Sequence, residues 1–116
     1  MSPLAAAIYA VLRGRVPARR PELSYTDLVG LLPAPWNSLD PDSDLLARAL
    51  GELVAGCRAE GLPAISAMVV RHRERVPGPG YYPMAHPAEA SDTPKAMIAW
   101  ANELEQVRKT KYPATL

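Results

Sequence analysis

The chain has 116 residues, of which 48% are apolar, and its 13 basic and 12 acidic side chains leave a net charge of +1. A chain of this length can bury one hydrophobic core, so we expect a single domain over residues 1–116. The small net charge excludes a general attraction to nucleic acid or anionic membranes, and any such binding must come from local clusters.

The lone cysteine excludes an internal disulfide and is typical of a reducing compartment. Residues 3–12 are apolar, but no basic segment precedes them and they are too short to span a bilayer. We therefore expect a cytoplasmic protein with no signal peptide and no membrane anchor.

The first helix is predicted from Ser2-Pro3, an N-cap and first-turn pair, to about Gly14, with apolar residues at helical spacing. Residues 15–22 contain Pro17 and Pro21 and cannot continue it. They form a basic loop, and with the preceding residue 13 they supply four arginines with no acid between them: Arg13, Arg15, Arg19 and Arg20.

A short second helix is predicted after Ser24, which stands three residues before Asp27 as in a capping box. Prolines end it, and the following turn contains Trp36, which we expect to be buried. The longest helix should span residues 41–60, from Asp40-Pro41 to a left-handed cap at Gly61.

The helix over residues 41–60 has two unlike faces. One half is apolar and should face the core, namely Leu45, Leu46, Ala49, Leu50, Leu53, Val54 and Cys57. The other half is small or charged and would let a groove or a partner approach closely, namely Asp44, Ala47, Arg48, Gly51, Ala55 and Ala59.

A core strand is predicted at residues 65–70, followed by Arg71, Arg73 and Arg75. The Pro/Gly-rich residues 76–80 must turn, so that Tyr81-Tyr82 can return as the second strand of an exposed hairpin. The order helix, helix, strand and wing predicts a helix-dominated α+β fold, a winged helix-turn-helix. Its core would span residues 1–83, with a linker at 84–93 and an added C-terminal packing helix at 94–112.

Several short segments carry a resemblance to a known family. They are Ile8-Tyr9, Val16-Pro17, Ser24-Tyr25-Thr26-Asp27-Leu28, Ala47-Arg48-Ala49-Leu50-Gly51, Pro63, Val69-Val70 and Gly80-Tyr81. Together they resemble the DNA-binding half of the alkylguanine-DNA alkyltransferases and the alkyltransferase-like proteins. The resemblance covers about the first 82 residues, and it implies that Tyr25 and Arg48 help to rotate a nucleotide out of the duplex. The family's Pro-Cys-His-Arg-Val segment is absent, since Pro63 is followed by Ala64-Ile65-Ser66, so alkyl transfer is excluded.

Structural alternatives stand beside each of these roles. Arg48 can pair with Asp44 one helical turn earlier, Tyr25 can pack at the edge of the core, and Cys57 on the apolar face is expected to be a buried, inert thiol. Asp40, Asp42 and Asp44 fail the spacing of a calcium loop, and we expect them to stabilise a helix N-terminus instead. They also disfavour contact between that helix end and DNA.

No residue pattern predicts catalysis, and neither a metal nor a cofactor is expected. The leading interpretation is a non-enzymatic module that binds double-stranded DNA through the nine residues Arg13, Arg15, Arg19, Arg20, Tyr25, Arg48, Arg71, Arg73 and Arg75. The alternative is a protein–protein adaptor, such as a small bacterial or phage accessory factor, that docks a partner through Asp44, Arg48, Gly51 and Ala55.

Overall fold

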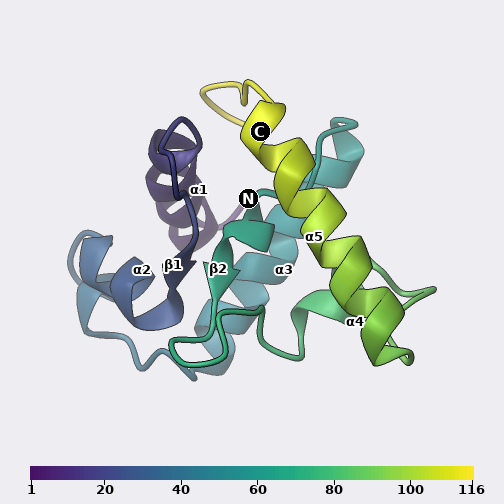
Figure 1. The fold of residues 1–116 in the computed structure, drawn as a ribbon. Helices are drawn as coiled ribbons and strands as arrows, with labels where there is room; N and C mark the ends of the chain where they lie inside the picture. Colours follow the sequence, from purple (N-terminus) through teal and green to yellow (C-terminus); the bar gives the residue numbers. More distant parts are fainter.

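A computed structural model describes all 116 residues. The fold is helix-dominated, with α1 (Pro3–Arg15), β1 (Leu23–Ser24), α2 (Tyr25–Leu31), α3 (Asp44–Ala59), β2 (Val69–Val70), α4 (Tyr81–Ala85) and α5 (Thr93–Lys109). Two 3-10 turns lie at Trp36–Ser38 (η1) and Ile65–Met68 (η2). In Figure 1 the two strands lie side by side, with α1 above β1, α2 to the left and α5 to the right.

Side-chain caps fix the starts of the helices. The Ser2 hydroxyl accepts a hydrogen bond from the Ala5 amide at 3.2 Å, and the Ser24 hydroxyl accepts one from the Asp27 amide at 3.0 Å, so both predicted caps are confirmed. The predicted start of α3 at Asp40-Pro41 is wrong, because Ser43 is the residue whose hydroxyl accepts from the Leu46 amide. Gly61 has a φ of 68°, as predicted for the left-handed residue that ends this helix.

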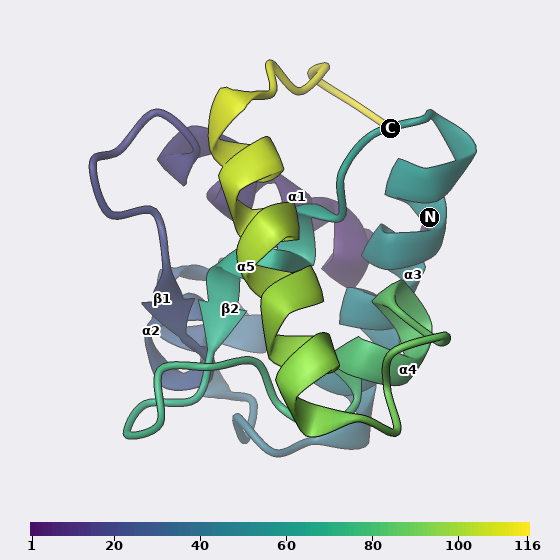
Figure 2. The same ribbon diagram turned by 45° about the vertical axis from the view of Figure 1, so that its right-hand side comes forward.

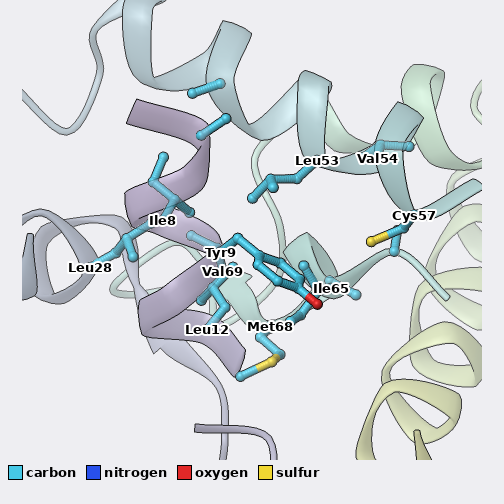
Figure 3. Packing of buried hydrophobic residues seen from close by; sticks show 14 of the residues in the cluster. Ile8, Tyr9, Leu12, Leu28, Leu53, Val54, Cys57, Ile65, Met68 and Val69 are labelled. Atoms are coloured by element: carbon cyan, nitrogen blue, oxygen red, sulfur yellow. The ribbon is translucent and has the colours of Figure 1, made fainter. Parts of the chain in front are cut away.

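The core forms where α1 and α3 meet η2, as the sequence predicts for the apolar face of the long helix. Figure 3 shows Ile8 and Leu12 of α1 in the same cluster as Leu53 of α3, together with Met68. Cys57 is fully buried in this cluster, which confirms its predicted position. Of the seven residues predicted to form the core-facing half of the long helix, two are not fully buried.

The two exceptions are Leu45 and Leu50. Leu45 is 51% exposed and Leu50 is only partly buried. Trp36, predicted to be buried, is also only partly buried against the core.

The sheet differs from the prediction. Only Val69 and Val70 of the predicted strand 65–70 are extended, and they pair in parallel with β1, Leu23 opposite Val69 and Ser24 opposite Val70. The predicted return strand is wrong, because Tyr81-Tyr82 begin α4 instead. The Tyr81 amide donates to the Gly78 carbonyl at 3.2 Å, and the Tyr82 carbonyl accepts from the His86 amide at 2.7 Å, so local bonds use backbone groups that a return strand would need.

The segment 71–80 therefore forms a compact loop in place of a wing. The Arg71 amide donates to the Val76 carbonyl at 2.8 Å, and the Gly78 amide donates to the Tyr25 hydroxyl at 2.8 Å. The first bond closes the loop on itself, and the second holds the loop against the start of α2.

α5 packs directly on η2. The Trp100 indole donates to the Ala67 carbonyl at 2.9 Å, and Ala96, Leu104 and Val107 are buried. Figure 2 shows α5 crossing the front of the molecule, with the loop that precedes β1 on the same side as the loop that follows β2. No helix is both long enough and apolar enough to cross a membrane.

Candidate functional site

The main candidate site is a depression that collects arginines from three separate parts of the chain. We call it the arginine groove, and its lining residues are Arg19, Arg20, Glu22, Arg75, Trp100 and Arg108. Its volume is about 460 Å³. Half of the groove comes from the loop after α1, and the rest comes from the loop 71–80 and from the outer side of α5.

Backbone geometry positions the groove arginines. The Arg108 guanidinium donates to the Arg19 carbonyl at 3.4 Å, which joins the end of α5 to the basic loop. Arg75 has a φ of 57°, in the left-handed region that a residue with a side chain seldom adopts, and its amide donates to the Arg71 carbonyl at 3.0 Å. The turn thus places Arg75 in the groove at a local conformational cost.

The groove is strongly basic. Arg19, Arg20, Arg75 and Arg108 make no ion pair with any acid, because the close contacts to carboxylates in the chain come from other side chains: Arg58, His86, Lys95 and Lys109. Glu22 is the single acidic residue of the lining. Four guanidinium groups around one carboxylate form a local positive surface on a nearly neutral protein.

The rest of the predicted basic loop has a structural role. Arg15 is the last residue of α1, and its Nε donates to the Pro21 carbonyl at 3.2 Å. The Nε of Arg13 donates to the Tyr112 carbonyl at 3.0 Å and ties α1 to the C-terminal segment. The four arginines that the sequence groups together are therefore divided, two inside the groove and two outside it.

The loop 71–80 divides its arginines in the same way. Arg73 is exposed and lies outside the arginine groove, whereas Arg71 lines a second cavity. Tyr25 also lines that cavity, and its hydroxyl accepts the hydrogen bond from the Gly78 amide. Burial raises the pKa of Tyr25, although the hydrogen bond from Gly78 lowers it. Tyr25 thus acts here as a packed anchor for the loop.

Arg48 lies apart from the groove. It lines a shallow depression with Asp44, Gly51 and Met84, and it makes no ion pair with Asp44. The face of α3 predicted to be open is partly covered, because a Cβ added at Gly51 would lie 3.4 Å from the Met84 Cε of α4. Ala55 on the same face is exposed.

Other reactive groups are packed away or isolated. Burial raises the pKa of the Cys57 thiol, which makes it a poor nucleophile. No group of three His, Cys, Asp or Glu side chains lies close enough together to hold a metal ion.

Sequence reasoning missed two features of these sites. Arg108 belongs to the basic end of α5, which the sequence assigned to packing alone, yet the run Arg108-Lys109-Thr110-Lys111 is a visible signal of surface charge. Ser66 is the one hydroxyl in the apolar run 62–70, and a buried hydroxyl needs a partner. Comparison with family models, curated proteins and solved structures found no match for this chain.

Proposed function

We propose that this protein is a small, non-enzymatic, cytoplasmic module that binds nucleic acid, with double-stranded DNA as its ligand. The observation that carries the proposal is the convergence of Arg19, Arg20, Arg75 and Arg108 on one groove. Like charges brought together repel one another, and a bound phosphate would offset that repulsion. Guanidinium groups also match phosphate oxygens with two parallel hydrogen bonds.

The N-terminal end of α3 is a poor contact for DNA. Asp40, Asp42 and Asp44 are exposed there and would repel phosphates. In our proposal the groove contacts the phosphate backbone, and base edges contribute little, so sequence preference is weak. The order α2, α3 and loop 71–80 supports a winged-helix comparison, with the loop in the place of the wing.

The proposal is tested by the salt dependence of binding. Labelled duplex DNA is titrated with the protein between about 50 and 200 mM salt, and the slope of log affinity against log salt is measured by fluorescence anisotropy. The double variant Arg20→Gln with Arg75→Gln should weaken binding and reduce the slope by about 1.8, or about 0.9 for each lost phosphate contact.

A charge-matched control separates the groove from general charge. Arg48→Gln with Arg73→Gln removes the same charge from exposed residues outside the groove, and it should leave most of the affinity and slope unchanged. Equal losses of DNA affinity and salt slope in both double variants would refute a localised site. Absence of binding to any duplex at about 50 mM salt would refute the proposal altogether.

The second candidate is a protein adaptor that docks a partner on the exposed face of α3. The favourable observation is that Met84, which is 52% exposed, lines one depression with Asp44, Arg48 and Gly51, and that Leu45, the next residue after Asp44, is 51% exposed. A protein partner would cover these apolar side chains. In this case Ala55→Trp should block association while the groove variants have no effect.

A further inference from the structure

A second cavity, which the proposed function does not use, lies between α3 and α4. We call it the α3–α4 cavity, and its volume is about 370 Å³, within the range of small-molecule sites. Its apolar wall comes from Leu46, Leu50 and Val54 of α3 and from Tyr81 and Met84 of α4. A surface of this kind accommodates a compact apolar group.

The wall of the cavity contains an unpaired buried hydroxyl. Ser66 is 5% exposed, and its Oγ has no hydrogen-bond partner. It is the one side-chain polar atom in the protein in this condition. An unsatisfied buried hydroxyl costs free energy, and a polar group of a ligand seated against Ser66 would remove that cost.

Two opposite charges lie at the rim of the same cavity. Arg71 and Asp42 both line it, both are exposed, and neither makes an ion pair within the chain. A purely anionic ligand would meet the Asp42 carboxylate, and a purely cationic ligand would meet the Arg71 guanidinium. The two rim charges balance each other. A ligand that fits them therefore carries one positive and one negative charge, or no charge.

We propose that the α3–α4 cavity binds a free apolar α-amino acid. The side chain would occupy the apolar wall, the carboxylate would bind Arg71, and the ammonium group would bind Asp42. A polar atom of the same head group would satisfy the Ser66 hydroxyl. This site shares no lining residue with the arginine groove, to which the loop 71–80 contributes Arg75.

The test compares three probes of the same shape. The full chain, labelled with nitrogen-15, is titrated with L-phenylalanine up to about 10 mM, at which even a millimolar site is mostly filled. 3-Phenylpropanoate lacks the ammonium group and 2-phenylethylammonium lacks the carboxylate. L-phenylalanine should shift the amide signals of Gly51, Gly78 and Gly80 and should bind at least about tenfold more tightly than either analogue.

Variants then test which side chain binds the carboxylate of the ligand and which binds its ammonium group. Arg71→Gln and Asp42→Asn should each reduce L-phenylalanine affinity about tenfold and remove its advantage over the matching analogue. Ser66→Ala should reduce affinity a few-fold without loss of folding, because it replaces an unpaired hydroxyl. Arg73→Gln, on the same loop but outside the cavity, is the matched control and should bind normally.

Three results would overturn the proposal. They are absence of binding by L-phenylalanine at about 10 mM, equal binding of all three probes, or signal shifts that persist unchanged in both Arg71→Gln and Asp42→Asn. The second result would show an apolar pocket without selection for the head group. DNA binding through the groove is measured separately, so the two proposals can fail independently.

Discussion

At the residue scale, the contact between Tyr25 and Gly78 shows how closely the loop 71–80 is fitted to α2. The Tyr25 hydroxyl accepts a hydrogen bond from the Gly78 amide, and a Cβ added at Gly78 would lie 2.9 Å from the same oxygen. Glycine is required here by a close approach of side chain to backbone, since this position has no unusual φ. The sequence shows the glycine, but the tyrosine that requires it lies 53 residues earlier.

This contact predicts non-additive mutational effects. Tyr25→Phe should lower the free energy of unfolding by about 1 kcal/mol through the lost hydrogen bond, and Gly78→Ala by about 1–3 kcal/mol through overpacking. The double variant should lose less free energy of unfolding than the two single variants together, because phenylalanine removes the oxygen that the new Cβ would meet. Urea denaturation of the four proteins measures the coupling, and additivity within about 0.3 kcal/mol would contradict it.

At the element scale, the sequence predicted four of the five helices, all but α4, and it predicted the segments between them poorly. Caps such as Ser2 and Ser24 are local signals, because hydroxyl and amide lie three residues apart. The parallel pairing of β1 with β2 joins residues far apart in the chain, and a two-residue strand has no periodicity to detect. The run 65–70 is buried as predicted, but its first four residues form a 3-10 turn.

The C-terminal segment is the element that the sequence least revealed. After α5, Tyr112 is 4% exposed, its hydroxyl donates to the Pro63 carbonyl at 2.6 Å, and its ring meets Tyr9 edge to face. The Tyr9 hydroxyl in turn donates to the Pro113 carbonyl. One tyrosine and one proline near a chain end, Tyr112 and Pro113, give no pattern that predicts such packing.

The C-terminal segment should therefore contribute strongly to stability. Tyr112→Ala removes a buried ring and leaves a cavity beside Tyr9, so the free energy of unfolding should fall by about 3 kcal/mol or more. Lys111→Ala, the exposed neighbour, should change it by less than about 0.5 kcal/mol. Chemical denaturation provides the measurement, and similar small effects of both substitutions would show that the segment does not belong to the core.

At the scale of the whole molecule, the candidate site arises from tertiary convergence. The sequence identified Arg19, Arg20 and Arg75 as basic surface residues, but their spacing gives no sign that they share a groove with Arg108. It also grouped Arg13 with them, although that side chain is turned to the C-terminal segment. Charge content was readable from the sequence, whereas the division of charge between groove, cavity and packing required the fold.

The aromatic content of the protein gives a final prediction, on stability in alkali. All five tyrosines have raised pKa values, and burial is the leading cause for each: Tyr9, Tyr25, Tyr81, Tyr82 and Tyr112. The shifts are largest for Tyr81 and Tyr112, which are 8% and 4% exposed. In the unfolded chain a tyrosine loses its proton near pH 10.

Stability should therefore be constant with respect to these groups below about pH 10 and should fall above it, because the unfolded state then binds fewer protons than the folded state. Tyr81 and Tyr112 together should contribute a loss of up to about 2.7 kcal/mol per pH unit. Urea denaturation between about pH 8 and 11 measures the loss, and ultraviolet absorbance follows tyrosinate formation in the same samples. The two most buried tyrosines should ionise together with unfolding, and Tyr81→Phe should reduce the slope. Ionisation of all five near pH 10 in a protein that remains folded would contradict the packing described for Tyr81 and Tyr112.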